Sequence, residues 1–333
     1  MKSSLYGIIP PLVTPFRADE ELVEGALRAD VRYMIEQAHV HGLVVGGSTG
    51  EGHTLSTDEL RRAVGAAVDE AAGRVPVLAG VIVDSTRQAV KCARALADLD
   101  LAALQVTPVH YLFRPSDDMM VRHFATIAAA AQVPVMIYNV VPWAHCSPAL
   151  LVRIMKEVDG VIGVKQSAGD LKLMADLLLL SEADSPISRS PMNRTSASLS
   201  DFSRESDKSD GNGEGRWLVM SAVDALLYPS FVLGAHGAIA AILAAAPTLC
   251  VQLWDAVKSG DHAQALDLHL KLLRIWNAIA GDNLPANVKC AMEVQGRLAS
   301  LPRAPMPPSS AAQRQAIHAA LQEAGLLNPQ DDS

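Results

Sequence analysis

The stretch VPVMIYNVVPWAHCSPALLVRIMKEVDGVIGVK, residues 133–165, decides the fold. It begins with an apolar run at Val133–Tyr138, continues through a helix-like segment, and ends in a second apolar run at Val161–Lys165. Apolar residues in each run are continuous rather than alternating, which indicates parallel strands buried on both faces. The two runs start about 28 residues apart, close to the roughly 30 residues of a β-α-β unit. The stretch therefore predicts two neighbouring parallel strands joined by a helix.

Further apolar runs of the same kind continue this pattern along the chain. They are Gly7–Val13, Gly42–Gly46, Val75–Gly80, Ala102–Val106, Trp217–Ser221 and Gly237–Ala241. Successive runs start about 20 to 35 residues apart, except for one interval of about 56 residues before Trp217. Eight strands with helices between them make a (β/α)8 TIM barrel, an α/β fold. We predict this barrel for residues 1–245, with a doubly wound open sheet as the alternative.

Helix-start signals support the predicted connections. Short polar groups around Ser56, Ser85 and Ser116 precede three of the helix-like segments, as capping residues do. After the eighth run, residues 246–333 contain further helix-like segments. We expect them to form the last barrel helix and a C-terminal helical extension.

The long interval contains a segment unlike the rest of the chain, at about residues 181–216. It reads SEADSPISRSPMNRTSASLSDFSRESDKSDGNGEGR, with few apolar residues and interleaved charges of both signs. Such a segment cannot bury enough surface to offset its ordering entropy, so we predict a disordered insertion. A phosphorylated regulatory loop is a sharper alternative. Because the segment joins a helix to the next strand, we expect it on the barrel face opposite the catalytic end.

Composition excludes several classes of protein. Half of the chain is hydrophobic, which is ample for a core, and the net charge of −8 argues against a nucleic-acid partner. No apolar stretch approaches the ~18 residues of a membrane span, and the N-terminus makes a poor signal peptide, so we expect a cytoplasmic protein. Four cysteines stand apart without a C-x-x-C pair, which argues against a disulfide framework or a zinc site.

A glycine-rich stretch, GGSTGEG at 46–52, directly follows a predicted strand. Glycines let the backbone turn sharply and present N–H groups to an anion, and Ser48 and Thr49 add hydroxyl groups. The spacing fits neither a P-loop nor a dinucleotide fingerprint. We therefore expect a cradle for a small anion such as a carboxylate, with a plain tight turn as the alternative.

Two strand ends carry groups suited to carbonyl chemistry. Lys165 ends one predicted strand and Tyr138 ends the strand before it, and strand ends hold the catalytic groups of such barrels. Burial disfavours a charged amine, and a neutral lysine forms Schiff bases with carbonyl substrates, while a phenol can move protons. Taken singly, the lysine could reach solvent and the tyrosine could simply pack at the barrel mouth. With the anion cradle, they predict a site for a 2-keto acid.

The motifs resemble those of the dihydrodipicolinate synthase/N-acetylneuraminate lyase family, which comprises class I pyruvate-dependent aldolases on a (β/α)8 barrel. The resemblance covers nearly the whole chain except the insertion. It rests on PPLVTPF at 10–16, GGSTGEG at 46–52, VTP at 106–108, IYNV at 137–140, GVKQSAGD at 163–170 and GAHGAI at 234–239.

The resemblance implies roles for the residues of these motifs. Lys165 would be the Schiff-base lysine and Tyr138 the proton-transferring tyrosine. Ser48 and Thr49, with Gly47, would bind the carboxylate of the keto acid, and Thr49 would also link to the proton relay. The family further implies a homotetramer with no metal or organic cofactor.

Other positions implied by the resemblance lie around the same barrel mouth. The backbone around Ile239 would line the pyruvate site. The family's second tyrosine, lent across a subunit interface, follows a Thr-Pro pair; Tyr111 is its counterpart here, with His110 in the expected spot. Trp143 and His145 would face the second substrate.

One departure from the family bears on the second substrate. Synthases that use aspartate semialdehyde carry an arginine five residues after the strand-five tyrosine, and Trp143 stands there in this chain. An indole cannot replace a bidentate carboxylate clamp. We therefore predict a Schiff-base lyase or aldolase for pyruvate or a related 2-keto acid, with the second substrate unassigned. The alternatives are a 4-hydroxy-tetrahydrodipicolinate (dihydrodipicolinate) synthase and a non-catalytic keto-acid-binding homologue.

Overall fold

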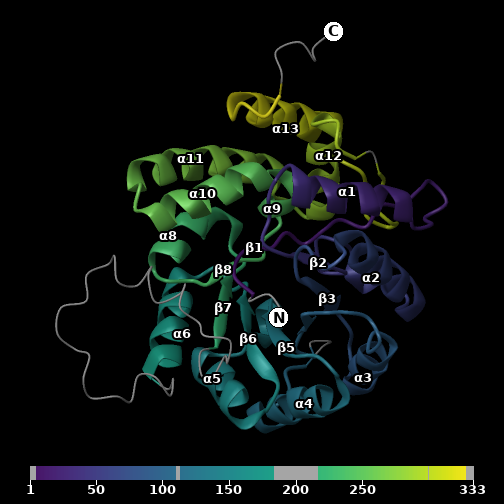
Figure 1. Ribbon diagram of the computed structural model, residues 1–333, viewed down its shortest axis with the longest axis vertical. Coiled ribbons are helices and arrows are strands. Elements are labelled where there is room, and N and C mark those ends of the chain that lie inside the picture. The colour runs from purple at the N-terminus through teal and green to yellow at the C-terminus, as the bar shows by residue number, and fades with distance from the viewer. Residues whose placement is uncertain (1–4, 110–112, 184–216, 299, 328–333) are drawn as a thin grey trace.

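The computed structural model describes residues 5–109, 113–183, 217–298 and 300–327 of the chain. Parallel strands occupy its centre and helices surround them (Figure 1). The strands are β1 (Gly7–Ile8), β2 (Leu43–Val45), β3 (Val77–Val81), β4 (Ala103–Val106), β5 (Val135–Asn139), β6 (Val161–Gln166), β7 (Leu218–Ser221) and β8 (Gly237–Ala238).

The strands form a closed ring. From β2 to β8 each strand pairs in parallel with the next in sequence, and β8 pairs with β1. The ring closes where the N–H of Leu12 donates to the carbonyl of Val44 over 2.8 Å and the N–H of Val44 donates to the carbonyl of Pro10 over 2.9 Å. The predicted barrel is thus confirmed, and the open sheet is excluded. Strand β1 is shorter than predicted because Pro10 and Pro11 have no N–H to give to a ladder.

Helices follow the strands in regular alternation. They are α1 (Glu24–Glu36), α2 (Thr57–Ala71), α3 (Thr86–Ala95), α4 (Asp117–Ala130), α5 (Pro148–Glu157), α6 (Leu171–Ala183), α8 (Leu227–Val232), α9 (Ile242–Ala245), α10 (Pro247–Ser259), α11 (His262–Ile279), α12 (Leu284–Val294) and α13 (Ala311–Glu323). The predicted caps are confirmed: the hydroxyl groups of Ser56, Ser85 and Ser116 each accept an N–H in the first turn of α2, α3 and α4. Each such cap contributes about 1 kcal/mol to helix stability.

Two apolar clusters hold the barrel together. The larger lies between the strands and the surrounding helices. The smaller fills the inside of the ring with one residue from most strands, namely Leu5, Ile9, Val44, Leu78, Ala103, Met136, Met220 and Ile239. This inner cluster fills the interior of the barrel with apolar side chains. The polar side chains described below lie at the strand ends.

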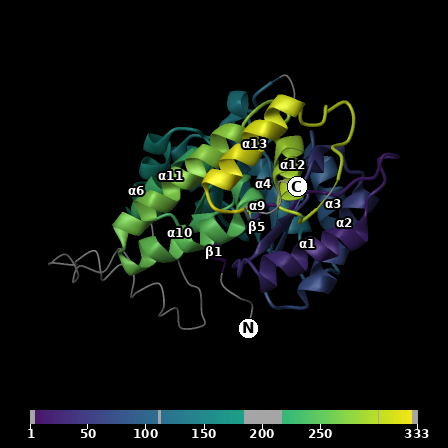
Figure 2. The same cartoon turned by 90° about the horizontal axis from the view of Figure 1, so that it is seen from above.

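The C-terminal helices pack on one side of the barrel. Helix α10 contacts β1, and α11 packs between α10 and α13 (Figure 2). Helix α12 contacts both α9 and α13. The division of the chain at residues 245 and 246 stays a prediction. No helix in the described ranges is long and apolar enough to cross a membrane.

Helix α6 overlaps the start of the predicted insertion, so the predicted bound at residue 181 is wrong. Residues 181–183 belong to α6, where the hydroxyl of Ser181 is buried and donates to the carbonyl of Leu177 over 2.7 Å. Helix α6 thus extends past the change in composition. Residues 184–216, which make up the rest of the predicted insertion, lie outside the described residues.

Candidate active site

Tyr138 and Lys165 lie side by side at the carboxyl ends of β5 and β6. They are register partners in the parallel ladder, so the main chain itself sets their proximity. Both side chains are buried, with exposed fractions of 4% and 3%. The Nζ atom of Lys165 stands 3.7 Å from the centroid of the Tyr138 ring. The amine is therefore held against a phenol and away from bulk water.

The loop after β2 brings a hydroxyl to this pair. The hydroxyl of Tyr138 donates to Oγ of Ser48 over 3.0 Å. Amine, phenol and hydroxyl thus form a chain that spans three strands of the barrel. The hydrogen bond between the phenol and the hydroxyl can pass a proton without help from solvent, while the amine lies against the face of the phenol ring.

The same loop presents unused backbone donors. The N–H of Gly50 donates to the carbonyl of Gly47 and the N–H of Glu51 to that of Ser48, each over 3.0 Å. Within the described residues, no hydrogen bond uses the N–H groups of Ser48 and Thr49. Two adjacent free N–H groups beside two hydroxyls make a cradle for a small anion. This geometry fits the predicted carboxylate site.

Glycines allow the loop to lie close over the barrel. Gly46 has a φ of 75°, a left-handed conformation that favours glycine. A Cβ added to Gly80, on β3, would collide with the carbonyl oxygen of Gly46. The backbone of the loop therefore sits directly on β3, and a larger residue at either position would lift it.

The segment after β5 is fixed by a buried amide. Asn139 donates to the carbonyl of Cys146 over 3.0 Å and to Oε1 of Gln166 over 2.8 Å, and it accepts the N–H of Cys146 over 2.9 Å. This ties down the turn that carries η2 (Pro142–Ala144) and His145. Nε2 of His145 is buried and has no hydrogen-bond partner in the described ranges.

The structure describes only some of the other predicted site residues. Ile239 is fully buried in the inner cluster, and its N–H donates to the carbonyl of Ser221 over 2.8 Å. Trp143 lies within η2, but its side chain is outside the described part of the structure. Tyr111 and His110 lie outside the described residues altogether.

Comparison with known proteins agrees with this geometry. The model of the dihydrodipicolinate synthetase family matches residues 4–186 and 208–324. The chain belongs to this family. Its members are class I aldolases and lyases. The break in the match falls within the predicted insertion, residues 181–216.

Relatives from this family align with the chain over nearly its full length. The 4-hydroxy-tetrahydrodipicolinate synthase of Methanopyrus kandleri is 32% identical and covers 98% of this chain and 99% of its own. That of Phenylobacterium zucineum is 34% identical and covers 96% of this chain and 98% of its own. A solved structure of a putative dihydrodipicolinate synthetase from Pseudomonas aeruginosa has a TM-score of 0.82 at 29% identity, and covers 96% of this chain and all of its own.

Sequence reasoning missed a carboxyl group near Lys165. Asp224, after β7, accepts the N–H of Ile242 over 2.7 Å. Burial raises the pKa of Asp224 to about 6, while the N–H of Ile242 and the charge of Lys165 act in the opposite direction. No local pattern singles out this aspartate, because its relation to Lys165 depends on the barrel closing.

Sequence reasoning also missed a buried amide on β4. Gln105 is fully buried, and neither its oxygen nor its nitrogen has a hydrogen-bond partner in the described ranges. A Cβ added to Gly47 would come within 3.9 Å of its Nε2. A buried amide without partners is costly, so this side chain suits contact with a polar ligand or water beneath the loop. A glutamine within an apolar run was the available signal.

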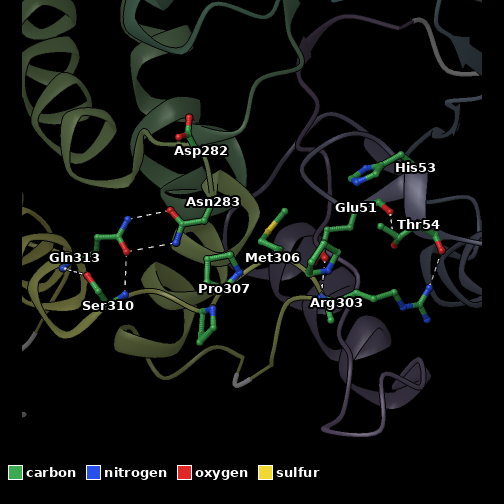
Figure 3. A pocket seen from close by; sticks show the side chains of 13 residues that line it. Glu51, His53, Thr54, Asp282, Asn283, Arg303, Met306, Pro307, Ser310 and Gln313 are labelled. Carbon is green, nitrogen blue, oxygen red and sulfur yellow. Dashed lines mark hydrogen bonds between the residues drawn. The ribbon is translucent and has the colours of Figure 1, made fainter. Parts of the chain in front are cut away.

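A cavity of about 540 Å³ lies on another side of the loop and is distinct from this site (Figure 3). Glu51, Thr54, Arg303 and Met306 are among the residues that line it, whereas Lys165 and Tyr138 are not. Within the described residues, no group of three or more His, Cys, Asp or Glu gathers as a metal site requires.

Proposed function

We propose that this protein forms a Schiff base between Lys165 and pyruvate or a related 2-keto acid, and makes or breaks a carbon–carbon bond through it. The observation that carries this proposal is the chain from the Lys165 amine through the Tyr138 phenol to the Ser48 hydroxyl, beside two free N–H groups. An amine, a proton carrier and an anion cradle are what a keto acid requires.

Each group then has a defined task. The loop around Gly47, Ser48 and Thr49 binds the carboxylate of the keto acid. The amine of Lys165 attacks the keto carbon, and loss of water from the resulting carbinolamine, with uptake of a proton, leaves an iminium. Tyr138 carries protons between the reacting atoms and the Ser48 hydroxyl. The iminium withdraws electrons from the adjacent carbon, which stabilises the enamine that forms or cleaves the new bond.

Asp224 supplies a test of this assignment through pH. Its carboxylate stabilises the positive iminium and holds the N–H of Ile242, and it is ionised above its pKa of about 6. We therefore expect kcat/KM to fall as the pH drops through about 6. Asp224→Asn should lower kcat/KM at pH 8 and remove this acid limb, as measured from pH 5 to 8.5. An unchanged acid limb in Asp224→Asn would assign the titration to another group.

The second substrate would meet Trp143, His145 and either Tyr111 or His110. Nε2 of His145 is buried and without a described partner, so it is available to a polar group of that substrate. The nearest arginine after Tyr138 in sequence is Arg153, which pairs with Asp118 and Glu157 on the outer helices. A substrate that relies on an arginine at position 143 to hold its own carboxylate would lack that contact here.

A 4-hydroxy-tetrahydrodipicolinate synthase is the second candidate, favoured by the name of the relatives above. It would condense pyruvate with aspartate semialdehyde. We expect pyruvate to be accepted readily and aspartate semialdehyde poorly, because a neutral indole replaces the arginine. In either case we propose a homotetramer that needs neither a metal nor an organic cofactor.

The decisive experiment is reduction with borohydride in the presence of separate 2-keto acids, followed by mass spectrometry. We expect a stable adduct on Lys165 with pyruvate or one of its relatives. An unmodified Lys165 under saturating pyruvate and the other keto acids would overturn the proposal. Turnover of each trapped keto acid against a panel of aldehydes would then identify the second substrate; an adduct without turnover would support a non-catalytic binding protein.

A further inference from the structure

The carboxylate loop is tied to the C-terminal helices by a buried ion pair. Glu51, the one charged residue of GGSTGEG, has no exposed side-chain surface, and Lys289 of α12 is 2% exposed. Nζ of Lys289 donates to Oε1 of Glu51 over 2.6 Å, across 238 residues of sequence. The N–H of Arg303 donates to the other carboxylate oxygen over 2.8 Å. Among the described residues, the hydrogen bonds to this carboxylate therefore come from the C-terminal extension.

The partners of Glu51 are themselves firmly held. Lys289 also donates to the carbonyl of Leu301 over 2.7 Å and stands 4.7 Å from the centroid of the Phe16 ring. Arg303 lies over the same ring at 4.1 Å. Its guanidinium donates to the carbonyl of Thr54 over 2.8 Å (Figure 3). It also pairs with Glu59 over 2.5 Å. We call Glu51, Lys289 and Arg303 the clamp.

The clamp holds the end of the loop that adjoins the anion cradle. Glu51 has a φ of 54°, which is uncommon for a residue other than glycine, and its N–H donates to the carbonyl of Ser48. The direction of the Glu51 side chain and the turn at Ser48 are thus set together. A buried ion pair by itself is weak evidence for stability, because desolvation offsets much of the attraction between the charges. Because this ion pair lies one turn from the cradle, its benefit concerns the geometry of the substrate site rather than stability.

We propose that Glu51 and Lys289 are positioning residues of the keto-acid site. By holding the turn at Ser48, their ion pair keeps the N–H groups of Ser48 and Thr49 aimed at the substrate carboxylate and the Ser48 hydroxyl within reach of Tyr138. The inference rests on the proposed function, since it assigns the loop to a keto acid. It makes the C-terminal extension necessary for substrate binding, although the clamp itself does not touch the substrate.

The chain offers a matched control for this idea. Asp30 of α1 and Arg297 form a second buried ion pair, with side chains 2% and 4% exposed and an N–O distance of 3.1 Å. This pair also reaches the C-terminal region, yet no hydrogen bond or ion pair among the described residues joins Asp30 to the loop. Glu51→Gln and Asp30→Asn each replace one buried carboxylate by its amide, so they differ mainly in location.

The test measures the pyruvate concentration that gives half-maximal borohydride trapping, together with the melting temperature. Glu51→Gln should raise the half-saturating concentration about 10- to 100-fold while trapping at saturation still occurs on Lys165. Asp30→Asn should lower the melting temperature about as much as Glu51→Gln does. It should leave the half-saturating pyruvate concentration within about twofold of the wild-type value. The double variant Glu51→Gln/Lys289→Met leaves no uncompensated charge, so it should melt higher than Glu51→Gln and still bind pyruvate weakly.

Several outcomes would overturn the inference. One is a wild-type half-saturating concentration in Glu51→Gln, or in the double variant if Glu51→Gln does not fold. Another is an equal rise in Asp30→Asn, which would mean that general loosening of the fold weakens binding. A wild-type protein that neither pyruvate nor the other keto acids modify would instead refute the proposed function, and the clamp assignment with it.

Discussion

Lys165→Ala should abolish turnover, with kcat falling at least about 10⁴-fold, because the reaction loses its nucleophile rather than a supporting contact. Another buried lysine, Lys289, is bound to Glu51 and cannot take over. The variant should stay folded, since no ion pair in the described ranges involves Lys165, and Asp224, which loses the charge of Lys165, can take up a proton. Steady-state kinetics measure the loss, and borohydride trapping should give no adduct.

Two comparisons separate the chemistry of Lys165 from its charge. Lys165→Arg keeps a cation at the end of β6, but a guanidinium forms no iminium under these conditions, so it should be as inactive as Lys165→Ala. Lys172→Ala removes an exposed lysine paired with Asp176 on α6 and should leave kcat unchanged. Residual activity within tenfold of wild type in Lys165→Ala, or an adduct on another lysine, would contradict the assignment.

The fold could be read from the sequence because its signal is periodic. Continuous apolar runs at β-α-β spacing require parallel strands buried on both faces, and the count of runs matches the observed ring. The predicted bounds were wrong for one strand and one helix. Pro10 and Pro11 shorten β1, and helix α6 continues through residues 181–183 despite their polar composition.

The candidate site was predictable where residues end neighbouring strands. Tyr138 and Lys165 terminate consecutive runs, and parallel register alone brings them together. Ser48 follows from the glycine loop after another strand. These residues needed only the topology of the barrel, which the spacing supplied.

The remaining polar groups depend on contacts that no local pattern encodes. Asp224 lies near Lys165 only once the ring has closed, and Gln105 is distinctive because its amide has no described partner. Glu51 stands within a motif, yet its partner Lys289 is 238 residues away. Such pairings follow from how the C-terminal helices pack, and one sequence does not specify that packing.

Tyr138→Phe should lower kcat about 10²- to 10⁴-fold while KM for the keto acid stays within a few-fold. The phenyl ring preserves the packing against Lys165, but the hydroxyl that donates to Ser48 over 3.0 Å is gone. Protons then have to reach the reacting atoms through water. The carboxylate cradle remains, because its N–H groups belong to the loop. Measuring kcat and KM separately with pyruvate and the identified second substrate tests both halves of this expectation.

A double-mutant cycle with Ser48→Ala asks whether the two hydroxyls act as one relay. If they do, Tyr138→Phe/Ser48→Ala costs little more in kcat than Tyr138→Phe alone, since either change already breaks the same proton path. Tyr228→Phe serves as the control, because that hydroxyl pairs with His262 among the outer helices and should leave kcat unchanged. Fully additive losses would mean that Ser48 serves the carboxylate only, and that Tyr138 passes its proton to a different acceptor.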